Sequence, residues 1–338
     1  MGRATYTIRR LLQGIPVMFG VVLITFLLTE SMPGDPVSIM LGPSPGLQQA
    51  AEIRAQYGLD QPVHIRFGKY IWNLLQGDLG RSLYYEVPVT TKIVERLPVT
   101  MLLVGASFVF GTITAIPLGV VSAKRRNKPV DHVSRVVALV GVSTPSFWIG
   151  LILIIVFAFH AQDVAWLPKF PATGLVLPWA DPATIDGASS RYDVIARSLE
   201  HLALPTLSLG TLRMAAFTRI ERSSMLEVLN QEYVKLARAY GVRERTILRK
   251  HAFHNAQLPL ITIMGLQLTA SLGGAVLTET VFEINGMGRL IITAVNNQDY
   301  YLVMGTTLMF GVVFVVGVIV VDLLYAYIDP RVSYEGGD

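Results

Sequence analysis

Two histidines, His251 and His254, lie three residues apart in a segment with helical periodicity. Side chains at positions i and i+3 share one face of a helix, so this pair could ligate a metal ion. The zinc-protease sequence H-E-x-x-H is absent, and paired histidines of this kind are more often interface or capping groups. The sequence therefore predicts no metal site.

The usual motifs of catalysis and nucleotide binding are also absent. A P-loop needs a lysine followed by serine or threonine, and no lysine here has that neighbour. The chain has no cysteine, which excludes thiolate chemistry. Glu279 and Asp322 lie near the ends of apolar segments, whereas a proton relay needs carboxylates deep within them. We expect a chain that is not an enzyme and binds no ATP or other cofactor.

Long uncharged runs dominate the composition, which is 52% hydrophobic and 15% charged. Uncharged runs follow Arg96 (27 residues), Arg135 (27) and Asp299 (22). Each can cross a hydrocarbon core of about 30 Å as a helix. Arg213 and Arg219 interrupt one weaker candidate, and their side chains must snorkel to an interface or face protein. The sequence predicts an all-α integral membrane protein with a single transmembrane domain over 1–338 and six spans, at about 9–29, 98–122, 136–160, 200–221, 256–279 and 301–325.

The basic residues predict the topology. Six spans place both termini on one side, which receives 18 of the 28 Lys and Arg residues, including the short run "KRRNK" at 124–128. The positive-inside rule makes that side cytoplasmic, in a multi-pass protein of the plasma membrane. Segment 31–96 is then extracytoplasmic, and the loop 223–254 is cytoplasmic. We expect an irregular outer loop over about 161–197, which is rich in Pro and Gly.

One helix is predicted within the extracytoplasmic segment. Phe67, Tyr70, Ile71, Leu74 and Leu75 recur at helical spacing, and Gly77 suits a helix end. This amphipathic helix either packs on the outer ends of the spans or lies in the membrane interface.

A dense charged segment, "EYVKLARAYGVRERTILRKH" at 232–251, carries eight charged residues. Within it an apolar stripe recurs at i, i+3, i+4 and i+7, on Tyr233, Leu236, Ala237 and Tyr240. Gly241 can take the left-handed conformation that ends a helix, and a second helical segment then leads into the fifth span. A solvated basic loop would need neither a stripe nor a glycine stop. The pattern favours a short helix that docks in a groove of another protein.

The stretch "YVKLARAYGVRERTILRKHAFHNAQLP" at 233–259 resembles the cytoplasmic EAA-type loop of ABC-importer permeases. Lys235 replaces the glutamate of the general motif, and Leu258-Pro259 lies further along than usual. Both departures resemble the dipeptide/oligopeptide branch, as do the Ala-Arg-Ala-x-Gly pattern ending at Gly241 and the pair Asn255-Ala256. The resemblance implies that the coupling to an ATPase is made by Tyr233, Leu236, Ala237, Arg238, Ala239, Tyr240 and Gly241.

Further segments resemble the same family in the same order along nearly the whole chain. They are "PGDP" at 33–36, "GLDQPV" at 58–63, "GDLGRS" at 77–82, "ERLPVT" at 95–100, "STPSFWIGL" at 143–151, "SSMLEVLNQEYV" at 223–234, "ETVFEINGMGRL" at 279–290 and "VDLLYAYIDPR" at 321–331. The resemblance implies the type I ABC-importer permease fold, with six transmembrane helices, a cytoplasmic coupling helix and a helical extracytoplasmic segment. The outer loop around 170–197 is longer than the family pattern suggests.

The same resemblance implies the partners and the cargo. They are a second homologous permease subunit, two cytoplasmic ATPases that bind ATP and Mg²⁺, and an extracytoplasmic substrate-binding protein, within membrane lipid and without nucleic acid. The cargo is then di- or oligopeptide, with nickel, glutathione and oligosaccharides as alternatives. A stand-alone carrier or channel would need an internal repeat or a buried ion site, and an intramembrane enzyme would need catalytic groups; the sequence favours neither.

A polar stripe on the fifth span is a candidate translocation path. Gln267, Ser271, Gly274 and Thr278 recur at i, i+4, i+7 and i+11. They could line a wet path, but small and polar residues also hold membrane helices together.

Overall fold

A computed structural model describes residues 3–31, 37, 46–57 and 60–328 of the 338-residue chain. The described residues are helical and contain no strand, only an isolated antiparallel bridge between Arg81 and Pro88. The chain divides into two units, Met1–Thr100 with Asn285–Asp338, and Met101–Ile284. The all-α prediction is confirmed for these residues.

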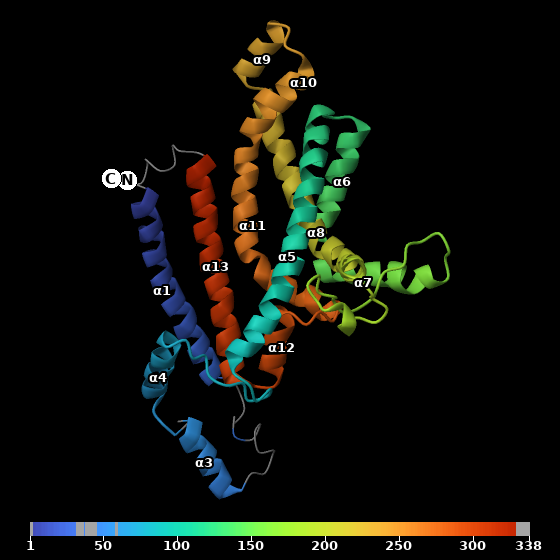
Figure 1. Cartoon of the computed structure of the whole chain (residues 1–338). Helices are drawn as coiled ribbons and strands as arrows, with labels where there is room; N and C mark the ends of the chain where they lie inside the picture. Colours follow the sequence, from blue (N-terminus) through green and yellow to red (C-terminus); the bar gives the residue numbers. More distant parts are fainter. Residues whose placement is uncertain (1–2, 32–36, 38–45, 58–59, 329–338) are drawn as a thin grey trace. The chain divides into compact units, whose positions relative to one another are not determined.

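The first unit contains two long helices and several shorter ones. The long helices α1 (Arg3–Glu30) and α13 (Tyr300–Ile328) lie side by side (Figure 1). The others are α3 (Leu47–Tyr57), α4 (Val63–Leu75), α12 (Met287–Asn296) and the start of α5 (Val89–Lys124).

Helix α4 is the amphipathic helix expected around 67–75, and it packs against this unit's own helices. Tyr70 is buried in a cluster with Phe26 of α1 and Met304 of α13. The Phe67 ring also contacts the Phe26 ring in a tilted arrangement, with 5.1 Å between centroids, and Arg66 donates to Glu30 at 2.6 Å. Four of the five predicted residues of α4 therefore pack on α1 and α13, whereas Leu75 is 77% exposed.

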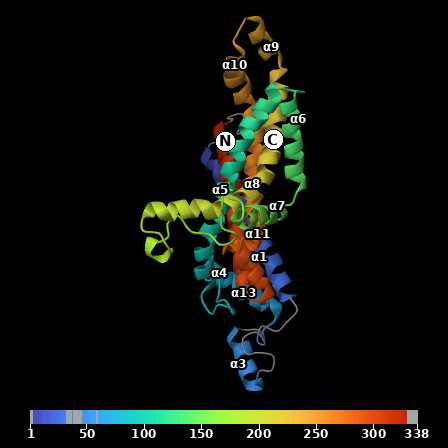
Figure 2. The ribbon, with the colours of Figure 1, turned by 90° about the vertical axis from the view of Figure 1, so that its right-hand side faces the viewer.

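The second unit is built around α8 (Arg191–Leu229), which packs along α11 (Phe253–Val281) and also contacts α6 (Pro129–Ser143) and α7 (Ser146–Ile154). A capping box of Ser190 and Asp193 starts α8. The helix changes direction along its length (Figure 2) and carries Pro205 inside, which removes a backbone hydrogen bond. The expected span 200–221 is the middle part of this longer helix.

Close helix contacts in the second unit depend on small residues. A side chain at Gly111 of α5 would lie 2.9 Å from Cβ of Arg213, and one at Gly119 would lie 2.6 Å from Cβ of Glu221. Helices α5 and α8 therefore touch along small residues, as membrane helices commonly do. Arg213 is buried and donates to Ser107 Oγ at 2.7 Å, so this arginine faces protein rather than lipid.

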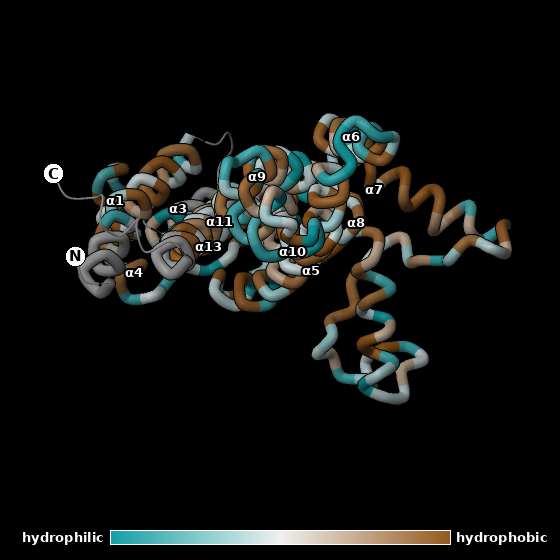
Figure 3. The backbone as a smooth tube through the Cα atoms, turned by 90° about the horizontal axis from the view of Figure 1, so that it is seen from above, coloured by the Kyte–Doolittle hydropathy of each residue, from teal (hydrophilic) through white to brown (hydrophobic). Residues whose placement is uncertain are grey.

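Within the part of the chain that the structure describes, three helices are long and apolar enough to cross a membrane by length and composition: α1, α5 and α13. A fourth is counted if α6 and the helical segment Ser146–Gln162 form one span. That segment is α7, coloured hydrophobic in Figure 3, with the turns η1 (Ile155–Phe159) and η2 (His160–Gln162). The count of six, which also needs α8 and α11, remains a prediction.

The third expected span, 136–160, differs from a single straight helix. The chain bends by 102° between α6 and α7. Thr144 is extended (φ −95°, ψ 127°), because Pro145 disfavours the helical conformation in the residue before it. The bend between α6 and α7 is thus caused by Pro145, which lies inside an uncharged run of the sequence.

The outer loop is irregular from Asp163 to Ser190, except for the turn η3 (Pro182–Thr184). Gly174 anchors it within the second unit, where its N–H donates to the carbonyl of Phe282 at 2.8 Å. The expected loop of 161–197 therefore ends earlier, because α8 already begins at Arg191.

Candidate coupling site

The charged loop folds into the short helix α9 (Glu232–Ala239) and the helical turn α10 (Glu244–Thr246). Both lie between the end of α8 and the start of α11, where Figures 1 and 2 show them beyond the ends of these two helices. Glu232 in the first turn and Arg238 in the last turn complement the helix dipole. From α10 the chain continues through the π-helical turn η4 (Ile247–Ala252) into α11.

Gly241 ends α9 in the left-handed conformation, with φ +75°. The N–H of Val242 donates to the carbonyl of Ala237 at 3.1 Å, and the N–H of Gly241 donates to the carbonyl of Arg238 at 2.9 Å. These two bonds form a Schellman motif, which satisfies carbonyls that a helix end leaves open. The expected helix and its glycine stop are both found in the structure.

The two faces of α9 differ in exposure. Val234 is fully buried against the chain itself, in a helix that contacts η4 and α8. The predicted stripe points outward: Tyr233 is 42% exposed, Leu236 57% and Tyr240 80%, with Ala237 half-buried among them. Large apolar side chains that are exposed together mark an interaction surface. We call the group Tyr233, Leu236, Ala237 and Tyr240 the outward stripe.

Polar contacts hold the α9 to α10 hairpin in shape. Arg238 forms two hydrogen bonds with Glu244, at 2.9 and 3.2 Å, across the Gly241 turn. These hydrogen bonds lower the pKa of the Glu244 carboxyl. The Asn255 side-chain N–H donates to the Tyr233 hydroxyl at 2.8 Å, which links α9 to the first turn of α11.

A small apolar cluster joins η4, which follows the hairpin and contacts α9, to the long helices. Met225 near the end of α8 packs with Leu248 and Ala252 of η4, Ala256 of α11 and Ala123 near the end of α5. A displacement of α9 is therefore resisted by the ends of three long helices.

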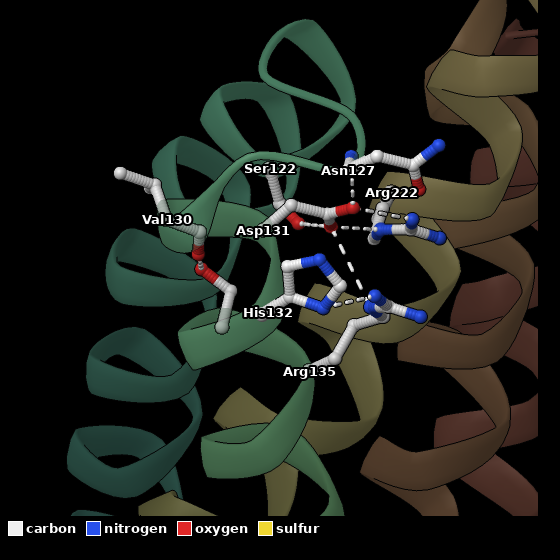
Figure 4. A network of polar contacts seen from close by, with 8 residues as sticks. Ser122, Asn127, Val130, Asp131, His132, Arg135 and Arg222 are labelled. Atoms are coloured by element: carbon white, nitrogen blue, oxygen red, sulfur yellow. Dashed lines mark hydrogen bonds and ion pairs between the residues drawn. The ribbon is translucent and has the colours of Figure 1, made fainter.

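An ion pair fixes the neighbouring connection between α5 and α6 (Figure 4). Asp131 in the first turn of α6 is fully buried and accepts two hydrogen bonds from Arg222 of α8, at 2.6 and 2.9 Å. The Ser122 hydroxyl and the N–H of Asn127 donate to the same carboxylate, at 2.6 and 2.9 Å. One carboxylate thus connects α5, the α5 to α6 loop, α6 and α8.

A second buried carboxylate joins α8 to α11. Glu221 is fully buried, and the side-chain nitrogen of Gln257 donates to both its carboxylate oxygens, at 2.9 and 3.0 Å. Glu221 and Arg222 are consecutive, so one turn of α8 is tied both to α11 and to the α5 to α6 hairpin.

Sequence reasoning missed Val234 and both buried carboxylates. Val234 lies off the periodic stripe at 233, 236, 237 and 240, so the spacing gives no signal for it. The sequence does mark Asp131 as unusual, because it is the only acidic residue in the strongly basic segment 123–135. A lone acid among bases suggests pairing, but its partner Arg222 lies 91 residues away.

The polar stripe on α11 is only partly described. The Ser271 hydroxyl donates to the carbonyl of Gln267 within the same helix, and Thr278 is fully buried. Gly274 lies in α11, but its surroundings fall outside the described residues. The structure brings the stripe together on one helix, and its role as a path remains a prediction. Likewise, the described residues hold no group of three or more potential metal ligands, and nothing here tests His251 and His254 further.

Comparison with known proteins decides the family. The family described as "Binding-protein-dependent transport system inner membrane component" matches residues 115–334. A second, described as "Binding-prot-dependent transport system membrane comp, N-term", matches residues 4–104. The chain belongs to this permease family. The resemblance to ABC-importer permeases inferred from the sequence is confirmed.

Several permeases of named transport systems are similar to this chain over nearly its full length. The oligopeptide transport system permease protein AppB of Bacillus subtilis (strain 168) is 36% identical, over 98% of this chain and 100% of its own length. The dipeptide transport system permease protein DppB of Alkalihalophilus pseudofirmus is 38% identical, over 97% and 99%. The glutathione transport system permease protein GsiC of Salmonella choleraesuis is 35% identical, over 98% and 99%.

Proposed function

We propose that this chain is one membrane subunit of an ATP-driven importer that carries di- and oligopeptides across the cytoplasmic membrane. The observation that carries the proposal is similarity along nearly the whole chain to an oligopeptide and a dipeptide permease, at 36% and 38% identity. The exposed stripe on α9 fits the same function, because such a subunit must dock on an ATPase.

In this proposal the outward stripe inserts into a groove of a cytoplasmic ATPase subunit, and ATP and Mg²⁺ are bound there. A second homologous permease completes the pathway, and an extracytoplasmic binding protein delivers the peptide. ATP drives the cycle because it binds one state of the ATPase pair more tightly than the other. The buried Val234 and the cluster around Met225 then carry the movement of α9 into α8 and α11.

Glutathione is the second candidate, since a glutathione permease is 35% identical over the whole chain. Glutathione is itself a peptide-like molecule with free carboxylates, so the same path could accept it. One experiment separates the two: the chain is reconstituted in proteoliposomes with its partner permease, ATPases and binding protein, and uptake of a labelled dipeptide, a labelled tetrapeptide and glutathione is compared.

We expect uptake of the peptides that requires both ATP and the binding protein, and no ATP hydrolysis by the isolated chain. Uptake of glutathione alone would favour the second candidate. Transport without ATP or binding protein would instead indicate a stand-alone carrier and contradict the proposal.

We also propose six spans with both termini in the cytoplasm. The chain has no cysteine, so single cysteines provide unique labels. Cysteines that replace Lys128 and Arg245 should react with an impermeant reagent only from the cytoplasmic side, and one that replaces Asp181 only from outside. Labelling of Arg245→Cys and Asp181→Cys from the same side would contradict this topology.

A further inference from the structure

A cavity of about 270 Å³ lies between α6 and α8, next to the ion pair of Figure 4. Its wall is mainly apolar, with Ala138, Leu139 and Val142 contributed by α6. Arg135, Arg219 and Arg222 line it as well. A water molecule occupies about 30 Å³ in the liquid, so the cavity has room for several methylene-sized groups. The combination of an apolar wall with arginines suits an amphiphile with an anionic head.

Thr218 of α8 provides an independent sign of a ligand. Its side chain lines the cavity and is only 4% exposed, yet its Oγ1 has no hydrogen-bond partner among the described residues. By contrast, the Ser134 hydroxyl in the same wall donates to the carbonyl of Val130 at 2.9 Å. Buried hydroxyls are nearly always paired. A ligand with an acceptor oxygen would complete the site.

The charge around the cavity is positive. Asp131 is engaged by Arg222 through two hydrogen bonds and is only approached by Arg135, at 3.9 Å. Arg135 also contacts His132 Nδ1 at 2.7 Å. Arg219 is exposed, and no ion pair or hydrogen bond of its side chain is found in the part of the chain that the structure describes. Three arginines therefore line the cavity, and the one neighbouring carboxylate, Asp131, is bound by Arg222. The basic run 124–128 lies close by in sequence.

The outer face of α6 is apolar and uncovered by the chain itself. Leu139 is 66% exposed, and Val133, Val136 and Val140 are similarly exposed. In a membrane protein such a face meets lipid chains or another helix. Arg135 lies towards the start of α6, the end that the positive-inside rule assigns to the cytoplasm.

We propose that this cavity binds an anionic phospholipid of the cytoplasmic leaflet. The phosphate lies between Arg219 and Arg135, where charge-assisted hydrogen bonds to guanidinium groups are strong. One acyl chain packs on Ala138, Leu139 and Val142, and the Thr218 hydroxyl donates to an ester oxygen of the lipid. Basic pockets between membrane helices on this side are known to select anionic head groups.

The test uses the complete importer, purified and delipidated in detergent, and titrated with phosphatidylglycerol or phosphatidylcholine under native mass spectrometry. We expect phosphatidylglycerol to bind preferentially. Arg219→Ala should weaken that binding about tenfold, as expected for the loss of one charge-assisted contact. Thr218→Val keeps the side-chain shape, and it should weaken the binding of both lipids by a smaller factor.

Arg126→Ala is the matched control, because Arg126 is an exposed arginine of the neighbouring loop that does not line the cavity. It should leave phosphatidylglycerol binding unchanged. Retention of the ATPase subunits by every variant shows that the complex is intact. Equal binding of the two lipids, or equal effects of Arg219→Ala and Arg126→Ala, would overturn the proposal.

A photo-crosslinking residue in place of Leu139 distinguishes lipid from protein at the same place. Crosslinks to phosphatidylglycerol in nanodiscs support the proposal. Crosslinks only to the second membrane subunit would show that a helix closes the cavity, and would also overturn it.

Discussion

Arg222 holds Asp131 through two parallel hydrogen bonds, Nε to Oδ1 at 2.6 Å and Nη2 to Oδ2 at 2.9 Å. The Asp131 side chain is fully buried, while that of Arg222 is 19% exposed. A bidentate pair of this kind is stronger than a single hydrogen bond and also fixes the orientation of the two side chains. It joins α6 to the turn of α8 that also carries Glu221. The pair thus links α8 directly to the α5 to α6 hairpin.

Asp131→Asn should lower the free energy of unfolding by about 3 kcal/mol, because removing one partner leaves a charge uncompensated in a largely buried site. The matched control is Glu232→Gln, which removes the exposed pair with Lys235 and should cost less than about 1 kcal/mol. Thermal unfolding of the detergent-solubilised chain measures both. Equal shifts for the two variants would mean that the buried pair is no more important than a surface pair.

Val234 and Leu236 form a second matched pair, on opposite faces of α9. Val234→Ala removes buried methyl groups and should destabilise the chain itself by about 1 to 2 kcal/mol. Leu236→Ala should leave the isolated chain unchanged but reduce co-purification of the ATPase subunits, because Leu236 is exposed on the outward stripe. Normal ATPase binding by Leu236→Ala and by Ala237→Arg together would contradict docking through the outward stripe.

Gly241→Val should strain the turn that ends α9. A side chain at this position would meet no atom within 4 Å, so the strain comes from φ +75° alone. A left-handed conformation costs a β-branched residue about 1 to 2 kcal/mol, whereas asparagine tolerates it. We expect Gly241→Val to keep some ATPase bound while ATP-driven uptake falls severalfold, and Gly241→Asn to behave almost as the wild type. Identical behaviour of the two variants would exclude the backbone explanation.

The Arg238 to Glu244 pair should make a small, pH-dependent contribution. The pKa of Glu244 is lowered in the folded chain, so its contribution to stability is present above the unfolded carboxyl pKa of about 4.3 and is lost as the pH falls through the folded value. Both side chains are more than one-third exposed, which limits the contribution to about 0.5 kcal/mol. Glu244→Gln should therefore lower the melting temperature slightly and equally at pH 8 and pH 6. A difference between wild type and variant that grows as the pH falls would contradict this sign.

Gln267→Leu tests the polar stripe of α11. If the stripe lines the path, uptake should fall while the subunits still assemble, since Gln267 is only half-buried. If the stripe holds helices together, assembly itself should weaken. Size-exclusion chromatography of the complex, measured beside uptake, separates these outcomes. Thr278→Val, at a fully buried position of the same stripe, provides the comparison.

Local patterns predicted the local structure well. The spacing of Phe67, Tyr70 and Leu74 identified α4, and the stripe before Gly241 identified α9 and its end, because both depend on residues within two or three turns of each other. The same reasoning overlooked Pro145 in an apolar run, although the restriction that proline places on the preceding residue is itself local.

Contacts between distant residues could not be predicted. The partner of Asp131 lies on α8, 91 residues further along the chain, and nothing in the sequence pairs Asp131 with Arg222 rather than with nearer arginines. Val234 differs from Leu236 in exposure only because η4 and α8 cover one face of α9. The packing of distant helices therefore determines which residues of the coupling site are buried, and a local sequence pattern does not contain it.

The corner between α6 and α7 has a mechanical consequence. Thr144 bonds back to Val140, and Trp148 bonds back to Pro145, so each helix closes its own end. Among the described residues, no backbone hydrogen bond passes from the last turn of α6 to the first turn of α7. The start of α7 is fastened to α8 instead, where the Ser208 hydroxyl donates to the carbonyl of Ser146 at 2.6 Å. The corner therefore has no backbone hydrogen bond of its own, and its angle is set by the contacts that α6 and α7 each make with α8.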